Sequence, residues 1–297
     1  MSGLTGEVLA GRYELEEVIG RGGHSVVFRA YDRVVDRNVA VKMLHDSVAG
    51  DPEYTVRMVR EQRATRLLSG TAAVRVLGMC TSPQGALCLI MELLEGDDLD
   101  DYLPKLEACG ERMGVDELVE VLSPIVDTLE AAHDAGIVHR DLKPGNIYLI
   151  DPRRGGGVRL LDFGLAKLKS AAPLTRSGMI IGSPSYIAPE VWAGQPALLD
   201  QRVDIYSLGA IVFRALAGRV PFEGATVREK LELVTTAPRP SLRALRPDLP
   251  KDVDNWVRQV LAVDPARRFW RIRAMWSALV DALGEESRAP TAVSSAS

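Results

Sequence analysis

A change of hydrophobic pattern near Gly96 constrains the fold more than any other feature of the sequence. Before this residue the chain contains short strand-like runs and one charged helical stretch, whereas after it apolar residues recur at helical spacing. With 297 residues the chain reaches the size at which a single hydrophobic core usually divides. The pattern therefore predicts an α+β chain with a small, β-rich N-terminal lobe and a larger, mainly α-helical C-terminal lobe.

The N-terminal lobe is expected to be an antiparallel sheet with one helix. Strand-like runs lie at 13–19, 26–31, 38–44, 74–80 and 86–94, and a helix is expected over 51–68. Amphipathic or fully apolar helical patterns follow at 118–129, 205–216, 253–263 and 272–283. These limits divide the chain into an N-terminal lead (1–11), an N-terminal lobe (12–94), a C-terminal lobe (95–284) and a flexible tail (285–297).

Composition excludes several classes of protein. The formal net charge of −4 gives no general attraction to nucleic acids or anionic membranes, so no nucleic-acid partner is expected. No apolar run is long enough for a membrane segment in this chain. The odd number of cysteines, Cys80, Cys88 and Cys109, at spacings that match no metal site, together with the lack of a signal peptide, predicts a cytoplasmic location.

A glycine-rich turn with Gly20, Gly22 and Gly23 lies between two strand-like segments. A dinucleotide-binding fold would require a helix after the glycines, so this context favours a β-hairpin instead. Glycine lacks Cβ and lets backbone N–H groups approach phosphate oxygens closely. The hairpin is therefore a candidate cover for a polyphosphate, although a glycine string alone is a weak signal.

Lys42 stands out because the chain has seven lysines and 29 arginines, and this lysine lies within an apolar strand. A compact ammonium group suits a phosphate, and a partly buried one needs an anionic partner. Glu61, on the expected helix, is a candidate partner. Its arginine neighbours leave a surface ion pair equally open.

Two further motifs favour the phosphate-binding interpretation of the glycine-rich turn and Lys42. The run His139–Asn146 (HRDLKPGN) follows a long amphipathic helix, and Leu161–Gly164 (LDFG) follows a short strand. With them, the sequence from about Arg12 to Leu283 resembles the eukaryotic-like serine/threonine protein kinases, in their bacterial form. The other motifs in the family's order are Gly20–Val27, Val39–Lys42, Glu61, Met91–Leu94, Ala188–Glu190, Asp204 and Arg268.

The resemblance implies a bilobal kinase fold and transfer of the γ-phosphate of ATP to protein Ser or Thr hydroxyls. It implies that Asp141 orients the hydroxyl and accepts its proton, and that Lys143 neutralises the transferred group. Asn146 and Asp162 are the expected ligands of Mg²⁺ (or Mn²⁺). The expected ATP contacts are Gly20, Gly22, Gly23, Val27, Ala40, Lys42 held by Glu61, Met91 at the back of the adenine pocket, Glu92, Leu94 and Asp98.

Regulatory and structural roles also follow from the resemblance. Thr175 and Ser177 resemble activating phosphorylation sites, with Arg140 as the phosphate's partner. Self-association for autophosphorylation in trans is expected, and Glu190 and Arg268 are expected to form a buried ion pair. The alternatives are a nucleotide-binding pseudokinase scaffold and a small-molecule kinase. Both a complete kinase and the catalytic part of a longer, membrane-anchored protein fit the resemblance.

Overall fold

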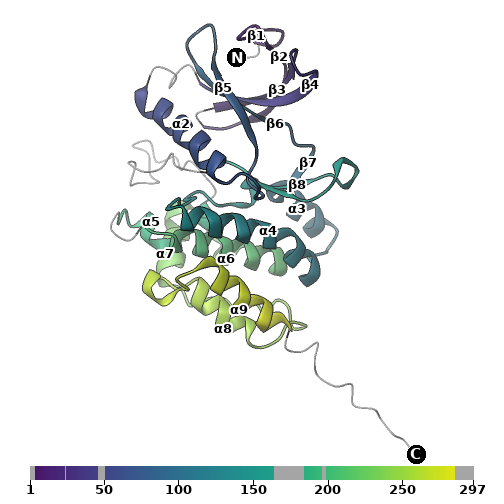
Figure 1. The fold of residues 1–297 in the computed structure, drawn as a ribbon. Coiled ribbons are helices and arrows are strands. Elements are labelled where there is room, and N and C mark those ends of the chain that lie inside the picture. The colour runs from purple at the N-terminus through teal and green to yellow at the C-terminus, as the bar shows by residue number, and fades with distance from the viewer. Residues whose placement is uncertain (1–3, 24, 46–50, 164–183, 196–198, 285–297) are drawn as a thin grey trace, which may run out of the picture.

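The chain forms two stacked lobes (Figure 1). The computed structural model describes residues 4–23, 25–45, 51–163, 184–195 and 199–284. The predicted tail, 285–297, and the predicted phosphorylation sites Thr175 and Ser177 lie outside the described residues. The predicted α+β fold with a β-rich N-terminal lobe and a helical C-terminal lobe is confirmed.

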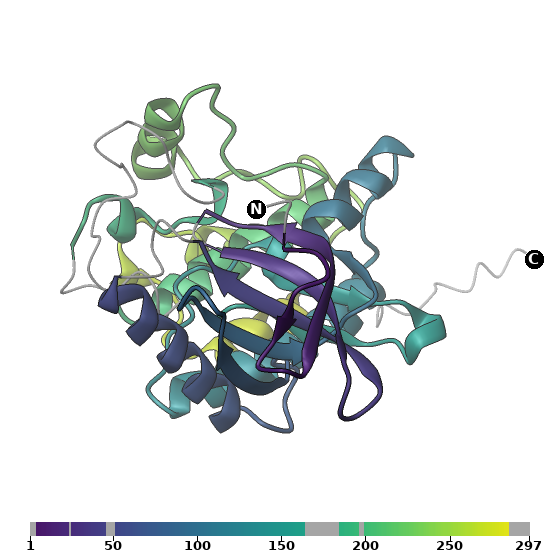
Figure 2. The same cartoon turned by 90° about the horizontal axis from the view of Figure 1, so that it is seen from above.

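The N-terminal lobe is an antiparallel sheet of six strands in the order β1-β2-β3-β4-β6-β5. Helix α2 packs beside β5 and β6, as the side view and the view from above both show (Figures 1 and 2). The first strand lies inside the segment that the sequence suggested as a lead. The elements are β1 (Val8–Leu9), β2 (Tyr13–Arg21), β3 (Ser25–Asp32), β4 (Arg37–Leu44), α2 (Pro52–Leu67), β5 (Val76–Thr81) and β6 (Leu87–Glu92).

Strand β4 shows why this sheet is stable. Its alternate residues Val39, Val41 and Met43 belong to one hydrophobic cluster, whereas Ala40 and Leu44 belong to a second cluster on the other face. Successive side chains of a strand point to opposite faces, so a strand that is apolar throughout is covered on both sides. The second cluster includes Met58 of α2, and Leu161 packs against it.

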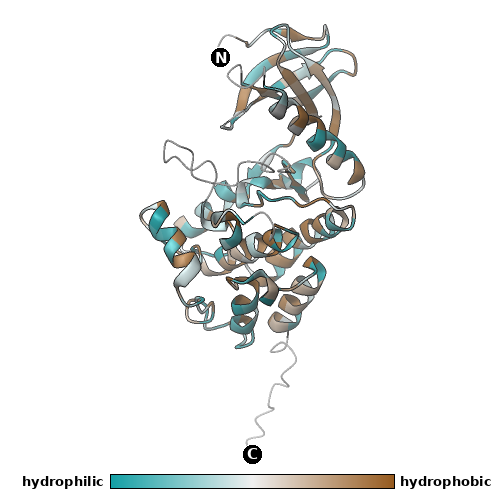
Figure 3. Ribbon diagram, turned by 90° about the vertical axis from the view of Figure 1, so that its left-hand side faces the viewer, coloured by the Kyte–Doolittle hydropathy of each residue, from teal (hydrophilic) through white to brown (hydrophobic). Residues whose placement is uncertain are grey.

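The C-terminal lobe is built around α6, which is buried along nearly its whole length, as its apolar sequence predicts. Figure 3 shows that hydrophobic residues dominate strands of the upper sheet, while the lower helices carry both hydrophobic and hydrophilic surfaces. The helices are α3 (Leu99–Ala108), α4 (Val115–Asp134), α5 (Pro189–Trp192), α6 (Arg202–Ala217), α7 (Val227–Thr236), α8 (Val253–Val260) and α9 (Ile272–Gly284).

A second sheet lies near the junction of the lobes, and of its strands the sequence predicted only the last, the short strand before Leu161. It has three antiparallel strands in the order β7-β8-β9, namely Gly96–Asp98, Ile147–Ile150 and Val158–Leu160. Strands of three or four residues are too short for a clear alternating pattern. Within the described ranges, no helix is both long enough and apolar enough to cross a membrane.

Candidate active site

Lys42 connects three elements of the site. Its Nζ atom donates hydrogen bonds to Glu61 Oε1 on α2 at 2.9 Å and to Asp162 Oδ1 after β9 at 2.7 Å. The predicted pairing of Lys42 with Glu61 is thus present, and the Glu61 side chain is 16% exposed. An ammonium group has three N–H donors, so two carboxylates leave one donor for a phosphate oxygen.

The electrostatics of this cluster reflect its burial. Burial alone would lower the pKa of Lys42, but the carboxylates of Asp162 and Glu61 outweigh it and raise that pKa above its usual value. Burial raises the pKa of Glu61, against the opposing effect of Lys42. Desolvation opposes ionisation of Asp162 too, yet the adjacent Lys42 ammonium lowers the pKa of Asp162. Lys42 therefore stays charged, and Asp162 remains a carboxylate able to bind a cation.

The catalytic loop brings Asp141, Lys143 and Asn146 together. Lys143 Nζ lies 3.7 Å from Asp141 Oδ2, and Asn146 Nδ2 donates to the carbonyl of Asp141 at 2.7 Å. The loop ends in a 3₁₀ helix, Pro144–Asn146, whose proline fits the first position because it has no N–H to satisfy. The segment Leu161–Asp162 is tied to the loop, since Leu161 N–H donates to the carbonyl of Asn146 at 2.8 Å.

Asp204, at the start of α6, holds the catalytic loop from below. Its two carboxylate oxygens accept the backbone N–H groups of His139 and Arg140, each at 2.8 Å. His133 Nε2 lies 2.8 Å from Asp204 Oδ2, and Asp204 is fully buried. The sequence marked Asp204 as a family motif but gave it no role. A signal was available, because a carboxylate within an apolar helix requires polar partners.

The loop backbone is held in an unusual conformation at two positions. Arg140 has φ +63° and Asp162 has φ +48°, both in the left-handed region that residues with a side chain rarely adopt. The ring of His139, which is fully buried, lies 5.1 Å from that of Phe163, and His139 Nε2 lies 3.1 Å from the carbonyl of Leu161. These contacts fix the catalytic loop against the Asp162 segment and fit a structural rather than an acid–base role for His139.

The glycine-rich turn lies between two antiparallel strands, as the sequence indicated. Gly20 pairs with Val27 across β2 and β3, and Gly22 N–H donates to the carbonyl of Ser25 at 2.8 Å. A Cβ at Gly20 would lie 3.5 Å from Val27 Cβ, which is ordinary contact. The predicted β-hairpin context of Gly20, Gly22 and Gly23 is therefore present.

The predicted adenine-pocket side chains lie in one hydrophobic cluster. Ala40 and Met91 are paired residues on β4 and β6, and both are at least nine-tenths buried. Val27 and Leu94 pack against the same cluster, and so does Leu161, which the sequence did not single out. Leu161 directly precedes Asp162. The expected adenine pocket and the expected metal-binding carboxylate thus adjoin.

Glu92 and Asp98 have structural contacts of their own. Glu92 Oε1 accepts the backbone N–H of Arg75 at 2.8 Å and Arg159 Nε at 3.1 Å. Asp98 caps α3 by accepting the N–H of Asp101 at 3.0 Å, and burial raises the pKa of Asp98. The side chains of both residues therefore position the segment between the lobes, and their nucleotide contacts remain predictions.

The oxygen atoms that Asn146 and Asp162 offer as ligands suit a magnesium ion that is bound mainly through phosphates. Asn146 uses its Nδ2 to bond Asp141, which leaves the amide oxygen for a cation, and the Asp162 side chain is 45% exposed. Mg²⁺ usually takes one or two protein oxygens together with water and substrate phosphates. In the described part of the chain no group of three or more His, Cys, Asp or Glu side chains could hold a metal ion.

The surroundings of Arg140 suit the binding of an anion. Its Nε atom is buried and has no hydrogen-bond partner among the described residues. The backbone N–H of Arg140 donates to Asp204, and this bond fixes the point from which the Arg140 side chain extends. A buried, unsatisfied charged donor is costly, and a phosphate would satisfy it.

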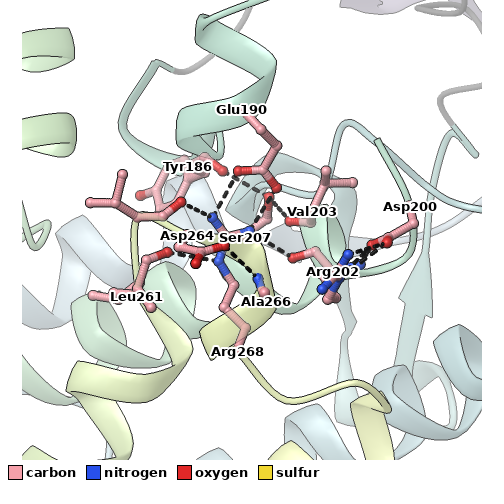
Figure 4. A network of polar contacts seen from close by, with 12 residues as sticks. Tyr186, Glu190, Asp200, Arg202, Val203, Ser207, Leu261, Asp264, Ala266 and Arg268 are labelled. Carbon is pink, nitrogen blue, oxygen red and sulfur yellow. Dashed lines mark hydrogen bonds and ion pairs between the residues drawn. The ribbon is translucent and has the colours of Figure 1, made fainter. Parts of the chain in front are cut away.

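Glu190 and Arg268 form the predicted ion pair (Figure 4). Their side chains are 1% and 0% exposed. Arg268 also donates to the carbonyls of Ala262 at 2.8 Å and Arg202 at 3.1 Å. The pair ties α5, which follows the segment containing the predicted phosphorylation sites, to the segment before α9.

The fold and the site define a protein kinase. A family model described as "Protein kinase domain" matches residues 13–276, and the chain belongs to this family. The family predicted from the sequence is confirmed.

Curated relatives are bacterial serine/threonine-protein kinases. The chain is 37% identical over 274 residues to PknA of Mycobacterium tuberculosis, covering 91% of this chain and 61% of the relative. It is 36% identical to Pkn1 of Myxococcus xanthus (95% and 40% covered) and 33% identical to PrkC of Bacillus subtilis (90% and 40%). The chain thus spans 40–61% of the length of these relatives.

A solved structure of the PknI kinase domain of Mycobacterium tuberculosis has a similar fold. The TM-score is 0.71 at 26% sequence identity, covering 93% of this chain and 98% of that one. The similarity extends over both lobes.

Proposed function

We propose that this chain is an ATP-dependent serine/threonine protein kinase that transfers the γ-phosphate of ATP to Ser and Thr hydroxyls of proteins. The observation that carries the proposal is the position of Lys42 Nζ between Glu61 and Asp162, at 2.9 and 2.7 Å. Relatives named serine/threonine-protein kinases over most of this chain support the same class of reaction.

The chemistry of each side chain in the site suits a specific role in phosphotransfer. ATP with Mg²⁺ supplies the phosphoryl group and the charge that neutralises it. Lys42 binds phosphate oxygens through its remaining donor, while Asp162 and Asn146 offer oxygens to the cation. Asp141 accepts the proton of the substrate hydroxyl while the hydroxyl oxygen attacks the γ-phosphorus and ADP leaves. Lys143, 3.7 Å from Asp141, stabilises the negative charge of the transferred group.

The alternative of a nucleotide-binding pseudokinase lacks support. Lys42, Asp141, Asn146 and Asp162 are all present, and the Lys42–Glu61 pair is formed. An inactive scaffold could keep all of these contacts. It would gain nothing, however, from a charged lysine held between two carboxylates in a buried place.

The test is incubation of the purified chain with Mg²⁺-ATP and a general protein substrate, followed by mass spectrometry of phosphosites. Phosphoserine and phosphothreonine on the substrate support the proposal, provided that Lys42→Ala abolishes them. Nucleotide binding without any phosphotransfer, under conditions in which a related kinase is active, would establish the scaffold instead.

Regulation by autophosphorylation is part of the proposal. A phosphate on Thr175 or Ser177 would add about −2 charge and accept hydrogen bonds from Arg140, whose Nε has no partner within the described residues. Self-association would let one copy phosphorylate another, so the specific rate of autophosphorylation should rise with protein concentration. A cytoplasmic location, where ATP is available, remains a prediction from the sequence.

A further inference from the structure

Cys80 and Cys88 face each other on neighbouring strands of the N-terminal sheet. They are directly opposed in the register of β5 and β6, so both side chains lie on the same side of the sheet. Directly opposed residues of an antiparallel pair have Cα atoms about 4.5–5.5 Å apart. Disulfides span Cα separations of about 4.4–6.8 Å, so the backbone already has the spacing that a disulfide needs.

The two thiols also differ in exposure. The thiol of Cys88 donates a hydrogen bond to the carbonyl of Ala86 at 3.4 Å. Cys88 is fully buried, Cys80 is partly buried, and both are free thiols. The neighbouring Cys88 thiol lowers the pKa of the Cys80 thiol. The neighbouring Cys80 thiol and burial together raise the pKa of the Cys88 thiol. The pair thus combines an accessible thiol that ionises more readily with a buried thiol beside it.

We propose that Cys80 and Cys88 are a redox modification site that forms a reversible disulfide with hydrogen peroxide as oxidant. The Cys80 thiolate attacks one peroxide oxygen, the O–O bond breaks, and protonation of the leaving oxygen gives water and a sulfenic acid on Cys80. The sulfur of Cys88 then attacks the sulfenic sulfur, hydroxide leaves, and the Cys88 proton completes a second water. Two electrons pass from the two sulfurs to the peroxide. A dithiol returns both cysteines to thiols.

The position gives the bond a structural consequence. Cys88 pairs on its other side with Met43 of β4, and the next residue of β6, Leu89, pairs with Lys42. A bridge therefore joins β5 covalently to the strand beside the one that carries Lys42. Closing the short hairpin restrains the unfolded chain, so the oxidised protein should melt about 5 °C above the reduced one.

The test uses the whole chain, reduced and then treated with hydrogen peroxide. Thiol titration after denaturation should fall from three thiols to one, and digestion without reductant should yield one peptide pair joined through Cys80 and Cys88. Dithiothreitol should restore three thiols and the lower melting temperature. Cys109→Ser is the matched control, because Cys109 is exposed on the other lobe and its loss should leave the bridge intact.

Two variants separate the chemical steps. Cys88→Ser should leave a sulfenic acid on Cys80 that a dimedone probe traps, and Cys80→Ser should leave Cys88 a free thiol. Oxidation of Cys80 to sulfinic acid in the wild type with no joined peptide would overturn the proposal, as would a bridge that involves Cys109. The test does not depend on kinase activity.

Discussion

Glu190 and Arg268 lie 78 residues apart in the chain, and their side chains form two hydrogen bonds of 2.7 Å in the interior of the C-terminal lobe. The guanidinium is also 4.9 Å from the ring centroid of Tyr206 on α6. Because both charges are removed from water, each depends on the other for compensation. The pair thereby fixes α5 relative to the segment before α9.

Removing one partner should destabilise the protein strongly. Arg268→Ala leaves the Glu190 carboxylate buried and unpaired, so the free energy of unfolding should fall by about 3–5 kcal/mol. Denaturant unfolding followed by circular dichroism measures this loss. Arg273→Ala is the matched control, because its ion pairs lie at the surface and should contribute no more than about 1 kcal/mol. Equal effects of the two substitutions would contradict the burial argument.

The two catalytic aspartates should fail in different ways. Asp141→Asn removes the proton acceptor and should lower the rate of phosphotransfer by about 10²–10⁴-fold, with nucleotide affinity nearly unchanged. Asp162→Asn removes the anionic oxygen offered to Mg²⁺ and should weaken Mg²⁺-dependent binding of ATP. Steady-state kinetics and calorimetric titration of ATP with and without Mg²⁺ distinguish the two. Full turnover by Asp141→Asn would disprove its role.

The pH dependence of stability should carry a contribution from Asp204. Burial opposes its ionisation, but His133 and the backbone N–H groups outweigh this and lower the pKa of Asp204 below its usual 3.8. A carboxyl with a lowered pKa in the folded state stabilises that state above pH 3.8, and the contribution is lost as the pH falls through the folded-state pKa. The difference in unfolding free energy between wild type and Asp204→Asn should therefore shrink as the pH falls below about 4.

Urea titrations from pH 3 to pH 7 measure this difference. Asp248→Asn provides a comparison, because Asp248 is at the surface and its partner Arg246 is near it in sequence. A wild-type advantage over Asp204→Asn that grows as the pH falls would contradict the assignment.

Activation should depend on the two hydroxyls that precede α5. The double variant Thr175→Ala/Ser177→Ala should remain at the basal rate after dephosphorylation and reincubation with Mg²⁺-ATP, whereas the wild type gains activity. Arg140→Ala should lose the gain while phosphate is still incorporated. Ser69→Ala, which removes an exposed hydroxyl after α2, should behave as the wild type. A double variant that reaches the wild-type rate on an added substrate would exclude this switch.

Much of the N-terminal sheet could be predicted because its signals are local. The β-prone run 26–31 and the apolar run 38–44 correspond to β3 and β4, and the helix expected over 51–68 is α2 at Pro52–Leu67. Helix α3 and the strands β7 and β8 could not be predicted in this way. These segments are short, and their sequences are charged or irregular in pattern. They adopt their structure because they pack at the junction of the lobes.

The sequence by itself determined the identities and spacing of the reactive groups, from Lys42 through Asp141 to Asp162, and with them the family. Only the tertiary structure decided which charges meet. Glu61 had arginine neighbours on its own helix, yet it bonds Lys42 because α2 packs against the sheet. Asp204 holds the catalytic loop, and Cys80 lies opposite Cys88, for the same reason. Hydrophobic periodicity reports which face of an element is buried, whereas contacts between elements depend on how those faces pack.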